Sequence, residues 1–231
     1  MKRNLFYCCL FVVLTGLHCS CNDDRAQEDL IGFWEPLPEL ATDLIWESSE
    51  PIVVNDFSMT TPEIAEISTQ FANTILPVKL RTVSFTKDNK VEVTHINDQT
   101  GYLITEVFGT YRMISRSKFS FSPDINKFAD GLEDMSVIML ETIKLYAKAG
   151  ISVQYYYVGN NTREVRFYLN TSTLTEFKLL FPLLAMAIMG KEADDAQIKA
   201  ILESVPAHLD KTTKIELGFN FYNPSFGSSS K

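Results

Sequence analysis

The amino-acid sequence predicts a mainly β protein with inserted helices, an α+β fold built on an antiparallel β-barrel. Apolar and polar residues alternate in many short segments, which is the period of a strand with one buried face. Short turn sequences join most of these segments and leave no room for the crossovers of a parallel sheet. Helical patterns interrupt the strands early and late in the chain of 231 residues. An antiparallel sheet that closes on itself accommodates this order of elements.

The first strand is expected at residues 30–34, an apolar run that Pro36 and Pro38 end because proline cannot donate a hydrogen bond to a sheet. Trp46 and the apolar residues 51–54 follow in a stretch that matches neither the strand period nor the helix period. No element is predicted there.

The first helix is expected to start at Thr61-Pro62-Glu63 and to end before Pro77. The hydroxyl of Thr61 would cap the free amides, the proline suits a first turn, and the acid faces the positive end of the helix dipole. Its apolar residues recur at helical spacing, at Ile64, Ile67, Phe71 and Ile75. The pattern predicts an amphipathic helix.

Strands and one helix are expected in the middle of the chain. Residues 83–85 and 91–93 alternate around Asp88-Asn89 and predict a hairpin. Residues 102–115 form a long strand-like stretch in which Gly109 predicts a bend or bulge, and residues 118–122 form a short strand. A helix follows from apolar residues at helical spacing, with Gly150 closing it, and these residues are Met135, Ile138, Met139, Ile143 and Tyr146.

The last part of the chain predicts a second hairpin, a strongly apolar helix and a final strand. Residues 151–157 and 165–169 alternate around the turn at residues 159–161. Thr173 and Glu176 resemble a capping box that opens a helix at residues 174–189. A short helix at Ile198, Ile201 and Leu202 and a strand at residues 215–221 complete the order of elements.

The N-terminus has the pattern of a bacterial lipoprotein precursor. Lys2 and Arg3 precede an apolar run of residues 5–17, which is shorter than the roughly 20 residues that span a bilayer. Ser20 then precedes Cys21, an arrangement that resembles the lipobox, although His18 stands where that motif has leucine. An ordinary secretory signal with incidental cysteines is the alternative.

The lipobox resemblance sets the expected boundaries and address of the protein. It implies a signal peptide at residues 1–20, lipid attachment at Cys21, a tether at residues 21–29, a single domain at residues 30–223 and a polar tail at residues 224–231. Asn22-Asp23-Asp24 resembles the start of surface-exposed lipoproteins of the Bacteroidetes. The resemblance implies an outer-membrane or cell-surface location, lipid-anchored, with the membrane as a partner.

Charge and cysteine content exclude several classes of function. Removing residues 1–20 takes away two basic residues and no acidic ones, so the net charge changes from −8 to −10. An acidic protein is a poor partner for nucleic acid, which is bound by clustered Lys and Arg. The four cysteines lie at or before Cys21, so the expected mature domain has no disulfide, thiolate nucleophile or cysteine metal site.

Gly32-Phe33-Trp34 resembles the Gly-x-Trp signature of lipocalins and of lipocalin-like lipoproteins, and the hairpin at residues 80–96 resembles their early hairpin. The resemblance implies a lipocalin-like barrel in which Gly32 and Trp34 mark a closed end, with Arg166 or Arg163 covering the tryptophan. It also implies an apolar small-molecule ligand, while the inserted helices leave the width of the pocket open.

No catalytic site, cofactor or metal site is predicted. His95 and His208 are the histidines of the expected mature chain, and no Gly-x-Ser-x-Gly turn places a serine for them. Residues 124–131 resemble a calcium loop until Phe128, which stands at a ligand position. The pair Asp194-Asp195 is better interpreted as favourable charge at a helix start than as a glycosidase pair.

Tyr155, Tyr157 and Phe167 are the candidate ligand-binding residues, since they form the densest aromatic patch of the sequence. The same residues are ordinary strand formers. We therefore expect a non-enzymatic lipoprotein that binds a hydrophobic small molecule in its barrel. The alternatives are an accessory subunit that docks onto a cell-envelope or nutrient-uptake assembly, and a hydrolase that relies on carboxylates.

Overall fold

The computed structural model describes residues 28–54, 57–97, 100–127, 137–159, 163–178, 204 and 206–227. The predicted signal peptide, Cys21 and most of the tether lie outside these residues. So do most of the apolar segment predicted as a helix at residues 174–189 and the short helix predicted near residue 200.

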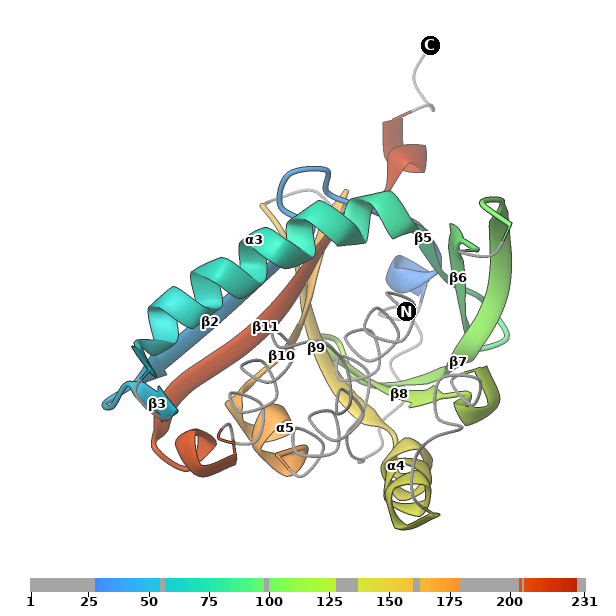
Figure 1. Ribbon diagram of the computed structural model, residues 1–231. Helices are drawn as coiled ribbons and strands as arrows, with labels where there is room; N and C mark the ends of the chain where they lie inside the picture. Colours follow the sequence, from blue (N-terminus) through green and yellow to red (C-terminus); the bar gives the residue numbers. More distant parts are fainter. Residues whose placement is uncertain are drawn as a thin grey trace.

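Eight antiparallel strands form a closed barrel, as the sequence predicts (Figure 1). The order around the barrel is β1, β5, β6, β7, β8, β9, β10 and β11, and β11 returns to β1. Their bounds are Gly32–Pro36 (β1), Leu80–Phe85 (β5), Lys90–Ile96 (β6), Leu103–Ser115 (β7), Lys118–Pro123 (β8), Ile151–Tyr157 (β9), Glu164–Leu169 (β10) and Thr212–Tyr222 (β11).

Strand β1 closes the barrel by changing partners halfway along its length. Gly32 to Trp34 pair with Val83 to Phe85 of β5, and Glu35 and Pro36 pair with β11. Gly32 has φ +138°, which favours glycine. The prediction that the strand ends before Pro36 is wrong, because the sheet continues through Leu37, whose N–H donates to the Asn220 carbonyl at 3.0 Å.

Strand β2, Thr42–Ser48, was not predicted. It continues the line of β1 along β11 as a ninth strand of the sheet. The chain bulges between the two strands, so that Asn220 of β11 bonds to Leu37 on one side of the bulge and to Ala41 on the other. Strands β3 (Ile52–Val54) and β4 (Phe57–Met59) form a separate two-stranded sheet.

Helix α3, Thr61–Lys79, lies along β2 (Figure 1). Its N-cap is Thr60, one residue before the predicted cap: the Thr60 hydroxyl accepts from Glu63 N–H at 3.4 Å, and the Glu63 carboxylate accepts from Thr60 N–H at 2.8 Å. Ile64 is buried, but Ile67 is exposed, so the buried face is rotated from the predicted one.

The prediction that α3 ends before Pro77 is also wrong. The helix continues to Lys79, and Leu80 N–H bonds to the Leu76 carbonyl as the C-cap. A proline in the last turn removes only one helical hydrogen bond. Leu76 and Leu80 are buried on either side of Pro77, and their burial favours the additional turn.

Both predicted hairpins and the predicted bulge are confirmed. Asn89 has φ +61° in the β5–β6 turn, and β9 pairs with β10. The β6–β7 register shifts so that Val91 pairs with Gly109 and Glu92 with Val107. A Cβ on Gly109 would lie 2.2 Å from the Ser122 carbonyl oxygen, so the bulge requires glycine.

Helices α4 (Val137–Ala149) and α5 (Thr171–Glu176) lie near one end of the barrel. The Tyr146 and Phe177 rings are 5.0 Å apart, which links α4 to the end of α5. The N-cap of α5 is Asn170, whose side chain accepts from Thr173 N–H at 3.1 Å, so the capping box predicted at Thr173 and Glu176 is wrong. Thr173 instead donates to the Ser152 carbonyl at 3.3 Å.

Short helical turns lie at both ends of the predicted domain. Residues 28–30 are helical: residues 28 and 29, in the predicted tether, are exposed, whereas Leu30, the first residue of the predicted domain, is fully buried. The first strand therefore begins at Gly32 and not at residue 30 as predicted. Pro224–Gly227, the start of the predicted polar tail, form a short 3-10 helix.

Candidate ligand cavity inside the barrel

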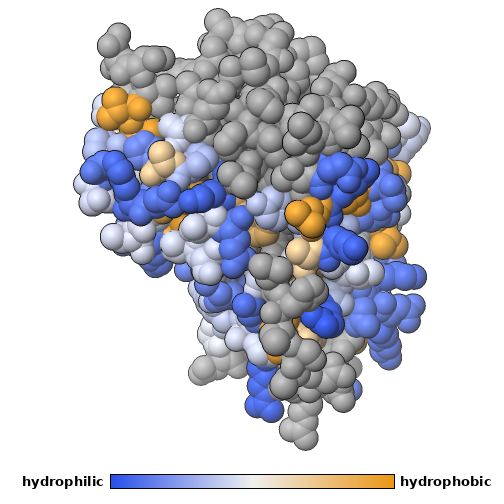
Figure 2. All heavy atoms as spheres, turned by 90° about the horizontal axis from the view of Figure 1, so that it is seen from below, coloured by the Kyte–Doolittle hydropathy of each residue, from blue (hydrophilic) through white to orange (hydrophobic). Residues whose placement is uncertain are grey.

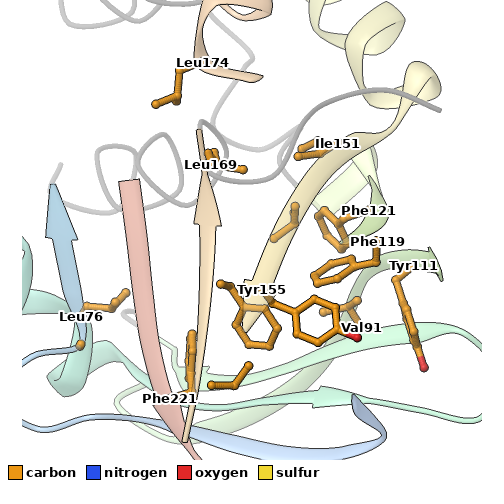
Figure 3. Close-up of a cluster of buried hydrophobic side chains, with 14 of the residues drawn as sticks. Leu76, Val91, Tyr111, Phe119, Phe121, Ile151, Tyr155, Leu169, Leu174 and Phe221 are labelled. Atoms are coloured by element: carbon orange, nitrogen blue, oxygen red, sulfur yellow. The ribbon is translucent and has the colours of Figure 1, made fainter. Parts of the chain in front are cut away.

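A layer of aromatic rings fills the barrel interior across its middle (Figure 3). The ring centroids are 5.0 Å apart for Phe85 and Tyr111, 5.4 Å for Phe85 and Phe119, and 5.8 Å for Phe119 and Phe167. Most of these rings meet edge to face, the arrangement that their quadrupoles favour. The layer divides the interior into two halves.

The half next to β1 is closed. Trp34 and Leu30 are fully buried, and Trp34 Nε1 donates to the Leu30 carbonyl at 3.0 Å. The Tyr157 ring lies 6.2 Å from the Trp34 ring. Gly32 and Trp34 therefore lie at a closed end of the barrel.

The other half contains a cavity of about 70 Å³. One water molecule needs roughly 10 to 15 Å³ on the same measure, so the cavity has room for several water-sized groups. Its described walls come from every barrel strand except β1, and from the end of α3. The described lining residues are Leu76, Leu80, Val83, Phe85, Val91, Val93, Phe108, Phe119, Phe121, Val153, Phe167, Tyr168, Leu169, Phe219 and Phe221.

The cavity walls are hydrocarbon throughout their described part. Tyr168 is the one described lining residue with a polar side-chain atom, and its ring lies 5.2 Å from the Arg166 guanidinium, among the side chains of the outer face. An apolar cavity binds water poorly because a water molecule there lacks hydrogen-bond partners. The arrangement favours an apolar occupant.

The three predicted ligand-binding residues lie on the inner face of the barrel, but only Phe167 of the three is among the described cavity walls. The Tyr155 ring lies 6.1 Å from Phe167 and 6.0 Å from Tyr157, which extends the ring layer toward the closed end. Tyr157 is next to Trp34. Burial raises the pKa of the Tyr157 hydroxyl, and the nearby Tyr155 and Asp29 raise it further.

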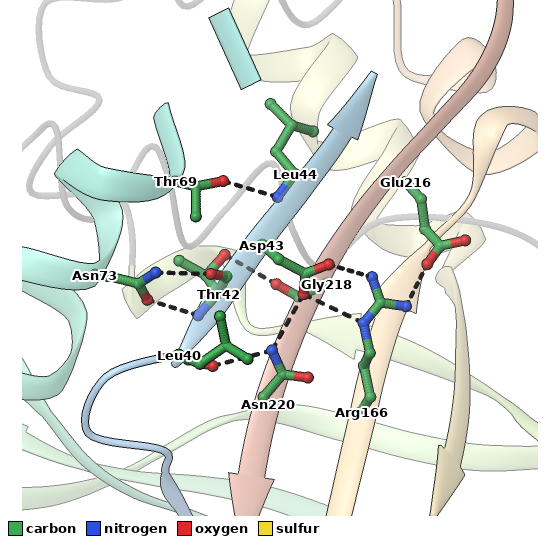
Figure 4. Close-up of polar contacts among 10 residues, drawn as sticks. All are labelled: Leu40, Thr42, Asp43, Leu44, Thr69, Asn73, Arg166, Glu216, Gly218 and Asn220. Carbon is green, nitrogen blue, oxygen red and sulfur yellow. Dashed lines mark hydrogen bonds and ion pairs between the residues drawn. The ribbon is translucent and has the colours of Figure 1, made fainter. Parts of the chain in front are cut away.

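Neither arginine suggested by the resemblance covers Trp34. Arg166 lies on the outer face of β10, where its guanidinium bonds to Asp43 of β2 and Glu216 of β11 (Figure 4). Arg163 is exposed. The tryptophan is covered instead by the helical turn that contains Leu30, whose carbonyl accepts its N–H.

The Arg166 cluster connects three strands. Arg166 Nη2 lies 2.7 Å from Asp43 Oδ2 and Nε lies 3.2 Å from Asp43 Oδ1, while Nη1 bonds to Glu216. Burial alone would lower the pKa of Arg166, but the bonds and charges of the two carboxylates outweigh it and raise the pKa. A Cβ on Gly218 would lie 2.4 Å from both Arg166 Nη2 and Asp43 Oδ1, so glycine leaves space for the pair.

The histidines contact structural partners. His95 is buried with its ring 5.7 Å from Phe108, and its Nε2 lies 3.3 Å from Glu106 Oε2. Burial lowers the pKa of His208, and Lys211 lowers it further. Among the described residues, no three His, Cys, Asp or Glu side chains gather in a group that could hold a metal ion.

Two cavity residues were not named from the sequence. Leu76 lies in the last turn of the predicted helix but outside its predicted apolar stripe, and Leu80 is the first residue of the hairpin expected at residues 80–96. The walls on the strands were indicated by alternation, since Val83, Phe85, Val91 and Val93 were all expected on one face.

In the part of the chain that the structure describes, no helix is both long enough and apolar enough to cross a membrane. Comparisons with protein-family models, with curated proteins and with solved structures gave no match.

Proposed function

We propose that this protein is a lipid-anchored, lipocalin-like lipoprotein outside the cytoplasm that binds a small apolar molecule in its barrel. The cavity of about 70 Å³ between the aromatic layer and the end of α3 is the observation that carries this proposal. A cavity in a protein core normally costs stability because its lining loses van der Waals contacts. A ligand that fills it restores those contacts.

The chemistry of the walls favours binding over catalysis. The described lining consists of aliphatic and aromatic side chains, and hydrocarbon groups neither transfer protons nor attack a substrate. The same walls define the ligand class. A charged or strongly polar ligand would lose its hydration without gaining hydrogen bonds, so the buried part of the ligand should be uncharged hydrocarbon.

Titration with xenon, an apolar atom that is small enough for a cavity of about 70 Å³ and is detected by NMR, tests the proposal. The purified protein should bind xenon in this cavity. Val153→Phe places a ring in the cavity and should lower the affinity by roughly tenfold or more. Val158→Phe is the matched control on the same segment, because Val158 is exposed. Unchanged binding by the Val153 variant would place the xenon elsewhere.

The anchor is proposed to be the lipid on Cys21. Replacing Cys21 with Ala should block lipid attachment and leave an unprocessed or mislocalised chain. Metabolic labelling with a fatty-acid analogue measures this, and a variant that takes up label as well as the native chain would refute the anchor.

The docking alternative has less support on the described surface. Many large exposed apolar side chains lie on different elements, such as Val53 on β3, Ile67 on α3 and Leu145 on α4, while Tyr102 and Leu103 are neighbours at the start of β7. On the face in Figure 2, the described hydrophobic residues form small separate patches among hydrophilic ones. Scattered apolar residues are normal on a monomer surface, whereas a docking site gathers them.

A further inference from the structure

The wall of the barrel is split on one side. Strand β1 pairs with β5 only at Val83 to Phe85, and β2 then continues along β11 without joining β5. The first half of β5 and the strand β2 therefore border a seam. Helix α3 runs beside β2 and leads directly into β5, so it lies along this seam (Figure 1).

Helix α3 takes the place of a strand at the edge of β2. Asn73 Oδ1 accepts from Thr42 N–H at 2.8 Å, and Asn73 Nδ2 donates to the Thr42 carbonyl at 2.9 Å (Figure 4). One turn earlier, Thr69 Oγ1 accepts from Leu44 N–H at 3.0 Å. Four helical residues rise about 6 Å and two strand residues about 6.6 Å, so both contacts fit at once. We refer to Thr69 and Asn73 as the latch.

The last turn of α3 is both a cavity wall and a weak point. Leu76 lines the cavity from this turn, and Leu80, the C-cap residue that begins β5, lines it next to the turn. Pro77 has no N–H to give to the Asn73 carbonyl, so the turn after the latch lacks one helical hydrogen bond. Beyond the latch, the end of α3 can therefore move with less loss of hydrogen bonding than an uninterrupted helix.

We propose that the latch and the last turn of α3 form a lateral gate through which the apolar ligand reaches the cavity. The proposal rests on the function proposed above. Opening separates the end of α3 from β2 and withdraws Leu76 from the cavity wall. The closed barrel strands and the aromatic layer then need not move. A gate changes how fast the ligand enters and leaves, and leaves the closed complex itself unaltered.

Exchange of xenon between water and the cavity, measured by NMR saturation transfer, tests the gate. Asn73→Ala removes two latch hydrogen bonds and should raise the association and dissociation rate constants together, by roughly fivefold, with little change in their ratio. Pro77→Ala restores the missing N–H and should lower both. Gln70→Ala is the matched control, because Gln70 is an exposed residue on α3 that bonds to Glu66 of the same helix.

The outcomes separate the gate from the binding function. Rate constants that are equal in all four proteins, with the native chain binding xenon, would overturn the gate and leave the cavity proposal standing. A native chain that binds no xenon would overturn both. Because Pro77→Ala removes no contact of the latch, it keeps the test decisive if Asn73→Ala fails to fold: unchanged rates in the Pro77 variant alone would refute the gate.

Discussion

The two halves of the barrel interior are both built mainly from hydrophobic side chains but are filled differently. The closed half holds Trp34, Leu30 and the rings around Tyr155, whereas the half bordered by the end of α3 holds aromatic and aliphatic side chains around a cavity. Hydrophobicity alone therefore does not separate the half that stabilises the fold from the half that can take a ligand. Packing does, because rings filling a space leave none for a guest.

Truncation should be most damaging in the closed half. Trp34→Ala should lower the free energy of unfolding by about 3 to 5 kcal/mol, since it removes a fully buried ring and its hydrogen bond. Leu76→Ala should have an effect of about 2 kcal/mol, because Leu76 already borders empty space and alanine suits a helix. Urea unfolding measures both free energies. Equal losses of stability in the two variants would contradict the expected difference between the two halves.

The Arg166 cluster should make the next largest contribution to stability. Arg166→Met leaves Asp43 and Glu216 partly buried without their cation, which should lower stability by about 2 to 4 kcal/mol and speed hydrogen exchange in β2. The control is Lys144→Met, which breaks an exposed pair with Glu141 and should cost less than about 1 kcal/mol. An Arg166 variant as stable as the control would mean that backbone pairing with β11 holds β2 in place without the ion pairs.

Adding one methyl group should have opposite effects in the two halves. Val165→Ile overfills the closed half and should be destabilising by about 1 to 2 kcal/mol. Val153→Ile extends into the cavity and should be neutral or stabilising by up to about 0.8 kcal/mol. Paired thermal and urea unfolding measurements check this, and destabilisation of both variants to the same degree would show that the cavity half is already full.

The smallest effect is expected at Tyr157, whose buried hydroxyl has no hydrogen-bond partner among the described residues. Tyr157→Phe should be neutral or stabilising by about 1 kcal/mol. Because burial raises the pKa in the folded state, the native chain should be fully stable below the unfolded tyrosine pKa of about 10 and lose stability above it. The variant should lose less above pH 10, and identical alkaline profiles would contradict this.

The strands that could be predicted are those whose pattern is local. The hairpins around Asn89 and at residues 151–169, and the bulge at Gly109, follow from alternation and turn residues within a few positions. Strand β2 could not be predicted in the same way. Its charged Asp43 obscures the alternation and makes sense only beside Arg166, which is distant in the sequence.

The candidate site was predicted only in part, because local alternation indicates which side chains point inward but not which of them meet across the barrel. Alternation placed Tyr155, Tyr157 and Phe167 on one inner face, but which of them borders the cavity depends on how eight tilted strands are staggered, and a single segment carries no such information. The implied role of Arg166 could have been rejected from the sequence. Its neighbours Val165 and Phe167 point inward, so Arg166 must point outward.

Unfolding with and without ligand tests the central claim most directly, namely that the half bordered by the end of α3 is an apolar ligand site. A ligand at a hundred times its Kd should raise the free energy of unfolding of the native protein by about 2.7 kcal/mol. Xenon should stabilise the native chain in proportion to its saturation of the cavity and have little effect on Val153→Phe. No increase in the native protein, or an equal increase in the variant, would contradict the account.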